Sequence, residues 1–163
     1  MSFHIRDARQ KDLRAVGQLA GRLVRMHHDY DPVRWMLIEG VEAGYARYFA
    51  SQLGEPGTII LVAEDDESGE IVGYTYASLV ERSWNDLREA CGALHDAFVI
   101  ERARRHGLAS SMLKESVRRL AALGAPFAVA TTAWQNETSQ ALLRSLGFRA
   151  AAIEFAKDLK QEA

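Results

Sequence analysis

The sequence predicts an α/β fold in which helices flank a mixed, mostly antiparallel central sheet. Three observations lead to this fold class. The middle strands are joined by short turns, which makes them antiparallel neighbours. A later strand is followed by a helix and a further strand, and such a crossover joins parallel strands. No Gly-x-Gly-x-x-Gly motif lies near the N-terminus, and strands do not alternate regularly with helices, which disfavours a doubly wound dinucleotide fold.

Length and composition indicate one ordinary globular domain, which we expect to span residues 1–163. The net charge of −2 argues against bulk binding to nucleic acid or to an anionic membrane surface. The single cysteine, Cys91, excludes an intramolecular disulfide and a multi-cysteine zinc site. No apolar run approaches the roughly 20 residues of a membrane span, and the first residues lack the apolar core of a signal peptide. A cytoplasmic location is therefore expected.

The N-terminal half alternates between strand and helix patterns. The expected elements are, in order, a strand at 3–8, helices at 12–28 and 33–53, and strands at 58–64 and 71–80. Gly54-Glu-Pro-Gly57 ends the second helix. The two later strands flank the polar turn 65–70, so we expect an antiparallel hairpin.

The C-terminal half contains the crossover. The expected elements are a strand at 93–100, a helix at 109–123, a strand at 127–132, a helix at 137–146 and a last strand at 148–158. Gly124 and Pro126 end the first of these helices, and Gly147 ends the second. Exposed edge strands of such a sheet can pair between copies, so a homodimer is possible.

The turn between the strand at 93–100 and the following helix has the composition of a phosphate-binding site. Residues 102–106 contain three arginines and a histidine, and Gly107, Ala109 and Ser110 are small. The first backbone N–H groups of a helix lack internal partners, and the helix dipole favours an anion there. This pattern predicts a ligand with a pyrophosphate or several phosphates. The alternative is a solvated basic turn before an ordinary amphipathic helix.

Two motifs carry a resemblance to a known family. The segment Arg104-Arg-His-Gly-Leu-Ala109 resembles the Arg/Gln-x-x-Gly-x-Gly/Ala motif of the GCN5-related N-acetyltransferases (GNAT). About thirty residues later, the segment from Asn136 through Ser139 to Leu146-Gly-Phe148 resembles the family's second signature. Element order and length also match across nearly the whole chain. The resemblance implies the acyl-CoA N-acyltransferase fold and transfer of acetyl from acetyl-CoA to a primary amine.

The resemblance also implies which residues hold acetyl-CoA. The strand before the turn would expose backbone groups to the pantetheine arm, the turn would hold the pyrophosphate, and the start of the last helix would contact the cofactor arm. The implied residues are Ala97, Phe98, Val99, Arg104, Arg105, His106, Gly107, Leu108, Ala109, Ser110 and Asn136. Asn136 is equally typical of a plain helix N-cap.

The general base is expected on the strand that enters the turn. In the diamine/polyamine branch of the family a Glu-Asp pair precedes the apolar segment, and the matching residues here are His95 and Asp96. A histidine with a pKa of about 6.5 is suited to taking an amine proton. Since neighbouring strand residues face opposite sides, we expect only one of the two to face the site. Glu81 is a second candidate base or amine anchor. Each of the three could instead be an ordinary surface or strand-end polar residue.

One position departs from the family pattern. Many members have a tyrosine as general acid seven residues after the Asn, and this chain has Leu143. A thiol pKa of about 8.5 makes a thiolate a fair leaving group without an acid. The departure keeps open a CoA-binding regulatory module that has lost catalysis. A third possibility is a protein acetyltransferase that acts on lysines or N-termini.

The acceptor is expected to be a small cationic amine or an amino-acid-like molecule. The resemblance places the loop after the first helix beside the acceptor, where Asp29, Asp31, Tyr30 and Trp35 would suit a cation. No metal is expected, because adjacent histidines such as His27 and His28 rarely share a metal ion and no Glu-x-x-His partner motif follows.

Overall fold

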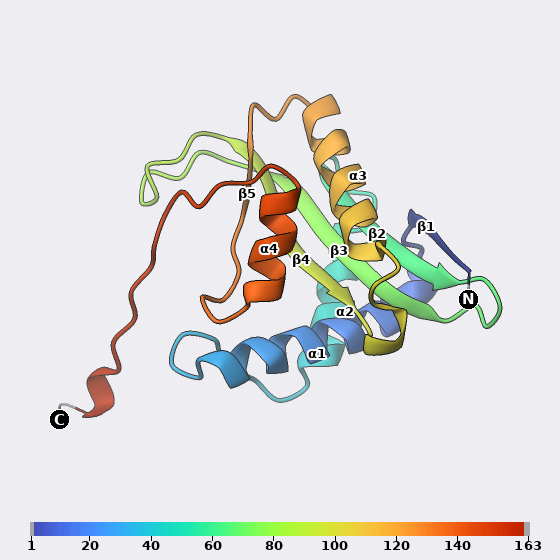
Figure 1. Ribbon diagram of the computed structural model, residues 1–163, viewed down its shortest axis with the longest axis horizontal. Coiled ribbons are helices and arrows are strands. Elements are labelled where there is room, and N and C mark those ends of the chain that lie inside the picture. Colours follow the sequence, from blue (N-terminus) through green and yellow to red (C-terminus); the bar gives the residue numbers. More distant parts are fainter. Residues whose placement is uncertain (1, 162–163) are drawn as a thin grey trace.

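The computed structural model describes residues 2–161 and contains a five-stranded sheet in the order β1-β2-β3-β4-β5. The strands are β1 (Phe3–Asp7), β2 (Thr58–Asp65), β3 (Ile71–Val80), β4 (Cys91–Val99) and β5 (Ala128–Ala130). The first four strands pair antiparallel, and β4 pairs parallel with β5. The predicted mixed, mostly antiparallel sheet is therefore confirmed, including the parallel pair made by the crossover (Figure 1).

The main helices lie on both faces of this sheet (Figure 1). They are α1 (Leu13–Tyr30), α2 (Val41–Gln52), α3 (Leu108–Ala122) and α4 (Glu137–Ser145), with short 3-10 turns η1 (Gln10–Asp12), η2 (Glu101–Ala103) and η3 (Leu159–Gln161). None of the helices within residues 2–161 has the length and apolar character that crossing a bilayer requires.

The two-residue period of β3 explains how the sheet is covered on both faces. Tyr74 and Tyr76 pack against Phe49 of α2, with ring centroids 5.9 and 5.3 Å apart. Thr75 points to the opposite face, where its hydroxyl lies 3.4 Å from that of Ser116 on α3. On that side Gly92 allows close packing, because a Cβ there would lie 2.8 Å from Leu120.

The predicted second helix is too long at its N-terminal end. Residues 33–40 form turns, and α2 begins only at Val41. The Asp31 carboxylate accepts hydrogen bonds from the backbone N–H groups of Val33 (3.0 Å) and Arg34 (3.1 Å), which closes a turn after α1. Trp35, which lies within the range predicted as helix, instead belongs to this loop and faces a cavity described below.

The predicted last strand at 148–158 does not form. After Phe148 the chain leaves α4 as an extended segment that runs away from the sheet (Figure 1). We call residues 149–158 the C-terminal arm; every residue from 149 to 157 is exposed. A strand needs a neighbouring edge for its backbone groups, and no strand in the described part of the chain lies beside the arm.

Candidate active site

The candidate site lies along the part of β4 that has a neighbouring strand on one edge and not on the other. On one edge β4 pairs with β3 over its whole length, from Cys91 to Val99. On the other edge it pairs with β5 only at Gly92, Ala93 and Leu94, because β5 ends at Ala130. The stretch that includes Ala97, Phe98 and Val99 therefore has one edge without a strand partner, which can pair with an extended ligand.

The predicted phosphate cradle, residues 104–110, is a turn that opens α3. Arg105 and Gly107 both have left-handed backbone angles, with φ of +65° and +73°. The first bond of the helix runs from the Ser111 N–H to the Gly107 carbonyl at 2.9 Å. The N–H groups of residues 108–110 precede this bond, so they point out of the helix start, where an anion is favoured.

The basic residues of the turn are not equivalent. Arg102 donates to Asp65 (3.1 Å) and Glu70 (2.5 Å), so its charge is already paired across the β2–β3 turn. Arg104 donates through Nε to the Val99 carbonyl at 2.9 Å, which ties the cradle to the end of β4. The His106 ring packs edge-on against Phe3 at 5.2 Å. Because Arg102 is already paired, the three arginines of the turn are not equally available to an anion.

Asn136 is the N-cap of α4. Its side-chain oxygen accepts a hydrogen bond from the Ser139 N–H at 3.1 Å, and the residue is only 9% exposed. The cap uses this oxygen, and no residue in the described part of the chain accepts a hydrogen bond from the two side-chain N–H groups. The plain capping role is thus present, and Asn136 also lines the cavity next to it.

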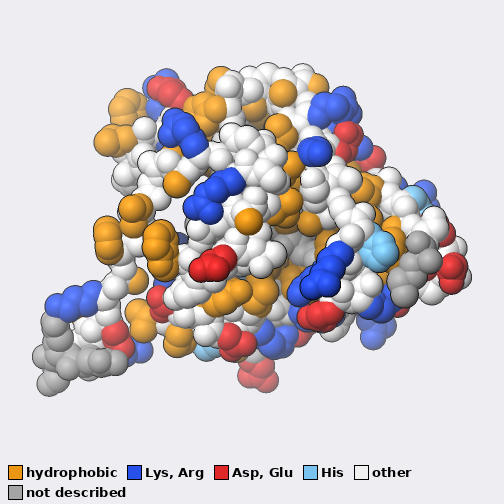
Figure 2. Space-filling view, viewed as in Figure 1, with side chains coloured by type: hydrophobic (Ala, Val, Ile, Leu, Met, Phe, Trp, Pro, Cys, Tyr) orange, Lys and Arg blue, Asp and Glu red, His pale blue; other side chains and the backbone are white. Residues whose placement is uncertain are grey.

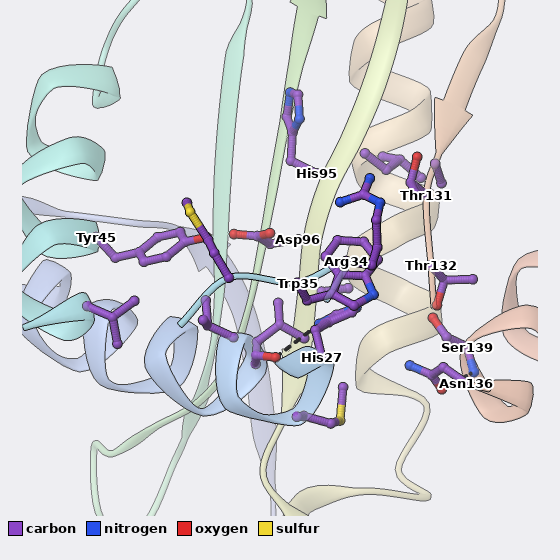
Figure 3. Close-up of a pocket in the computed structure, with 18 of the residues that line it drawn as sticks. His27, Arg34, Trp35, Tyr45, His95, Asp96, Thr131, Thr132, Asn136 and Ser139 are labelled. Atoms are coloured by element: carbon purple, nitrogen blue, oxygen red, sulfur yellow. Dashed lines mark hydrogen bonds between the residues drawn. The ribbon is translucent and has the colours of Figure 1, made fainter. Parts of the chain in front are cut away.

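A cavity of about 850 Å³ adjoins the open stretch of β4. It lies among the loop after α1, α2, β4, the segment after β5, and α4 (Figure 3). Its polar and aromatic lining comprises His27, Arg34, Trp35, Tyr45, Tyr48, His95, Asp96, Thr131, Thr132, Asn136 and Ser139. Leu143 also lines it, so the position where many family members have a tyrosine faces the same space.

A β-bulge brings both predicted catalytic residues of β4 to the cavity. Tyr76 pairs with Asp96 and Ala77 pairs with Leu94, which leaves His95 as an extra residue in the strand. Both His95 and Asp96 line the cavity. The expectation that only one of them could face the site is therefore wrong, because strict alternation fails at a bulge.

Asp96 is a buried carboxyl in an aromatic setting. Burial raises its pKa to about 6, and the hydrogen bond from the Tyr74 hydroxyl (3.1 Å) opposes this rise. Figure 3 shows the Asp96 carboxyl and the Tyr45 ring directed toward each other across the cavity. Burial, followed by the nearby Asp96 charge, raises the pKa of Tyr45. A carboxylate among aromatic rings is suited to holding an ammonium ion.

His95 directly precedes Asp96 on β4, and two neighbours orient its ring (Figure 3). Its ring stacks on Tyr76 with centroids 4.7 Å apart, and Nε2 lies 2.8 Å from the Ser78 hydroxyl. The surrounding protein lowers the pKa of His95 by desolvation. The imidazole is therefore mostly neutral at pH 7 and able to accept a proton.

Other expected residues do not gather at the cavity. Glu81 follows β3, is exposed and does not line it. Asp29 is exposed and Asp31 closes its own turn, whereas Trp35 does line the cavity. Residues 2–161 hold no group of three His, Cys, Asp or Glu side chains able to bind a metal ion.

Several lining residues were not expected from the sequence, among them Tyr45, Tyr48 and Thr132. Tyr45 and Tyr48 lie on α2, and a helical pattern alone does not indicate that both line the cavity. Thr132 was assigned to a buried strand, yet its hydroxyl is buried without a hydrogen-bond partner among the described residues. An unpaired buried hydroxyl beside a cavity is a candidate ligand contact.

Comparisons with known proteins agree with this geometry. The profile of the acetyltransferase (GNAT) family matches residues 22–148. No curated protein matches the sequence significantly.

Three solved structures show the similarity of fold. The aminoglycoside N-acetyltransferase AAC(6')-Iy, in complex with CoA, has a TM-score of 0.75 and 19% identity, over 97% of this chain and 95% of that chain. The glucosamine-6-phosphate N-acetyltransferase from Arabidopsis thaliana has a TM-score of 0.71 and 17% identity, over 98% and 99%. The aminoglycoside 6'-N-acetyltransferase AAC(6')-IG from Acinetobacter haemolyticus has a TM-score of 0.69 and 22% identity, over 96% and 99%.

At these low identities the likeness to solved structures establishes the fold, and the family profile, which covers most of the chain, establishes the family. The chain belongs to the acetyltransferase (GNAT) family and is an acetyl-CoA-dependent N-acetyltransferase.

Proposed function

We propose that this enzyme acetylates the primary amino group of a small cationic amine bound in front of His95 and Asp96. The observation that carries the proposal is the position of the Asp96 carboxyl. It lies in a cavity with Tyr45, Tyr48 and Trp35, beside the stretch of β4 that has no strand partner. An ammonium group would find there a carboxylate and aromatic faces together.

Acetyl-CoA would lie along the open edge of β4. The N–H groups at the start of α3 would hold its pyrophosphate, with Arg104, Arg105 and His106 around it and Gly107, Leu108, Ala109 and Ser110 forming the turn. The backbone of Ala97, Phe98 and Val99 would pair with the pantetheine arm. Asn136 and Thr132 would offer side-chain hydrogen bonds from the opposite wall of the cavity.

His95 would act as the general base. When Nε2 carries the proton and donates to the Ser78 hydroxyl, Nδ1 keeps a lone pair for the ammonium proton, directly or through one water. The neutral amine then attacks the thioester carbonyl, so that a C–N bond forms and the C–S bond breaks. The second proton of the amine passes to the free thiolate after the C–S bond has broken, and His95 returns its proton to the solvent. Backbone N–H groups on the open edge of β4 would stabilise the oxyanion.

Leu143 leaves the position of the family tyrosine without a proton donor. The departing thiolate is stable enough, at a thiol pKa of about 8.5, for the reaction to proceed without an acid there. The proposed chemistry therefore depends on binding, orientation and the base more than on acid catalysis.

The acceptor class can be tested with a panel of amines scored by thiol release. The panel contains a diamine, a polyamine, an aminoglycoside, glucosamine 6-phosphate, an amino acid, and a peptide with a free N-terminus and a lysine. We expect the cationic small molecules to give the highest kcat/KM, because Asp96 pairs with positive charge. A preference for the peptide would contradict the proposal and favour a protein acetyltransferase.

The matched variants are Asp96→Asn and Glu81→Gln. Asp96→Asn should raise the acceptor KM by roughly 10- to 100-fold, the typical value of a charged hydrogen bond. Acetyl-CoA affinity, measured by calorimetric titration, should not change. Glu81→Gln removes an exposed carboxylate outside the cavity and should leave both constants unaltered. Equal effects of the two substitutions would overturn the role of Asp96.

A further inference from the structure

The acceptor cavity carries few charged groups for its size. Among the lining residues that the structure describes, Asp96 is the only carboxylate and Arg34 is the only arginine or lysine. The Arg34 guanidinium is paired with Glu154, which lies outside the lining. A ligand with one ammonium group therefore finds one carboxylate in the cavity, and a second ammonium group would find none.

Much of the remaining lining is apolar. Aliphatic and thioether side chains from α1, α3 and the loop after α1 line the cavity: Leu23, Val24, Met26, Met36, Ile38 and Leu113. Leu143 adds an aliphatic side chain from α4, at the position where many family members have a phenolic hydroxyl. Apolar walls favour a ligand whose own surface is apolar, because both surfaces then leave water.

The aromatic wall at Trp35 is held in place by contacts on several sides. Its backbone N–H donates to the Asp31 carbonyl at 2.9 Å, and its own carbonyl lies 2.8 Å from Nδ1 of His28. The Trp35 ring lies 4.7 Å from that of His27, and the Arg34 guanidinium lies 4.4 Å above it. The wall is therefore formed before a ligand binds, which lowers the entropic cost of binding.

The same loop exposes apolar side chains to solvent beside the cavity. Met36 and Ile38 line the cavity, yet they are 76% and 56% exposed. Figure 2 shows apolar side chains at the lower left of the main body, where Figure 1 places the loop after α1. Exposed apolar surface that continues a binding cavity indicates contact with an apolar part of the ligand.

We infer that the acceptor is a monoamine, with its single ammonium group at Asp96 and an apolar body against Trp35, Met36 and Ile38. The inference rests on the proposed function and narrows its acceptor class. Polyamines and aminoglycosides are disfavoured, because their further ammonium groups would lose water in the cavity without gaining a carboxylate. An apolar body gains from the same loss of water.

Hexylamine and 1,6-diaminohexane form a matched pair of acceptors, because they share the reactive amine and the six-carbon chain. The wild type should use hexylamine with a kcat/KM at least about tenfold higher, the order of magnitude for one unpaired charge. Thiol release from acetyl-CoA measures both rates. Equal use of the two amines, or a preference for the diamine, would overturn the inference.

Met36→Glu adds a carboxylate to the apolar part of the lining. The ratio of kcat/KM for hexylamine to that for the diamine should fall by roughly tenfold, because the second ammonium group gains a partner. The control is Leu37→Glu, which adds the same charge at the next residue, outside the lining, and should leave the ratio unaltered.

Both substituted side chains are exposed, by 76% at Met36 and 42% at Leu37, so both variants should fold. An equal change of the ratio in the two variants would trace it to the charge of the surface rather than to the cavity lining, and would overturn the inference.

Asp96→Asn distinguishes failure of this inference from failure of the proposed function. If this substitution leaves the KM of both amines unchanged, Asp96 does not hold the ammonium group, and the proposed function fails together with the inference. If it raises both KM values but the wild type prefers the diamine, the proposed function stands and only the monoamine assignment is wrong.

Discussion

The two edges of β4 differ although one strand of nine residues forms both. The edge toward β3 is paired from Cys91 to Val99 and is covered by aromatic packing around Tyr74 and Tyr76. The edge toward β5 is paired at three residues and then opens beside the cavity and the cradle. The two edges of β4 differ because their neighbouring strands differ in length, and β5 has only three residues.

The two edges of β4 serve different purposes: one is bonded within the sheet, and the other is largely unpaired. Backbone groups on the β3 edge are used by the sheet, and within residues 2–161 those beyond Leu94 on the other edge have no strand partner. The bulge at His95 directly follows Leu94, the last residue of β4 that pairs with β5. It brings two titratable side chains, His95 and Asp96, to the cavity.

The largest expected effect is on acetyl-CoA affinity, when the turn at the start of α3, beside the unpaired edge of β4, is altered. Gly107→Val places a branched side chain at φ +73° in the cradle, which strains the turn and blocks an anion from the N–H groups. The loss of two or more charge-assisted hydrogen bonds should weaken acetyl-CoA binding by at least about 100-fold. Calorimetric titration measures this change.

The control for that variant is Gly124→Val. Gly124 follows the C-terminal end of the same helix with φ +91°, and a Cβ meets no atom within 4 Å at either glycine. The backbone strain should therefore be similar, but acetyl-CoA affinity should be retained. Similar losses of affinity in both variants would mean that strain, and not the cradle, explains the result.

A smaller effect is expected on the free energy of unfolding when Asp96 is replaced. This residue lies on β4 just beyond the part that pairs with β5. Burial raises the folded-state pKa to about 6 from the ordinary 3.8. A raised carboxyl pKa favours the folded state below pH 3.8, and this advantage is lost as the pH rises through about 6. Asp96→Asn should therefore raise the free energy of unfolding at pH 7.5 by roughly 1–3 kcal/mol relative to the wild type.

Urea denaturation at pH 7.5 and at pH 4 measures this difference. The gain of Asp96→Asn should shrink toward zero at pH 4, where the wild-type carboxyl is largely protonated in the folded state. The matched control is the same substitution at an exposed carboxylate outside the cavity, Asp29→Asn. A gain that is the same at both pH values would show that the charge at Asp96 is not its cause.

The smallest expected effect comes from adding an acid to the open side. Leu143→Tyr restores the residue that many family members carry at a position that lines the cavity. Because the thiolate leaves without help, kcat should change by less than about threefold. An increase of tenfold or more would show that protonation of the leaving group limits the native enzyme, contrary to the proposed chemistry.

Much of the fold was accessible from the sequence, because period and turn chemistry are local signals. The hairpin of β2 and β3, the crossover through α3 and the cap at Asn136 all follow from residues close in the chain. The start of α2 was predicted too early, at residue 33. The Asp31 side chain closes a turn there, and such side-chain hydrogen bonds do not change the spacing of apolar residues. The predicted last strand at 148–158 does not form, because an alternating pattern does not supply the neighbouring strand that its backbone groups need.

The site was predictable in part for the same reason. The cradle was visible because its small and basic residues are consecutive. The acceptor side was visible only in part. Asp96 and Trp35 were expected there, whereas Tyr45 and Tyr48 of α2 and Thr132 after β5 meet them only in the fold. The bulge that turns His95 and Asp96 to one cavity depends on pairing with β3, which neighbouring residues alone do not reveal.

Hydrogen exchange of the wild type with and without saturating acetyl-CoA tests the difference between the two edges most directly. The ligand should protect amides within residues 95–99 and 107–110 and leave those of β1 and β2 unchanged. That result would place the cofactor on the open edge of β4 and at the start of α3. Binding that protects neither segment, or protects a different part of the sheet, would contradict the assignment of this edge as the acetyl-CoA site.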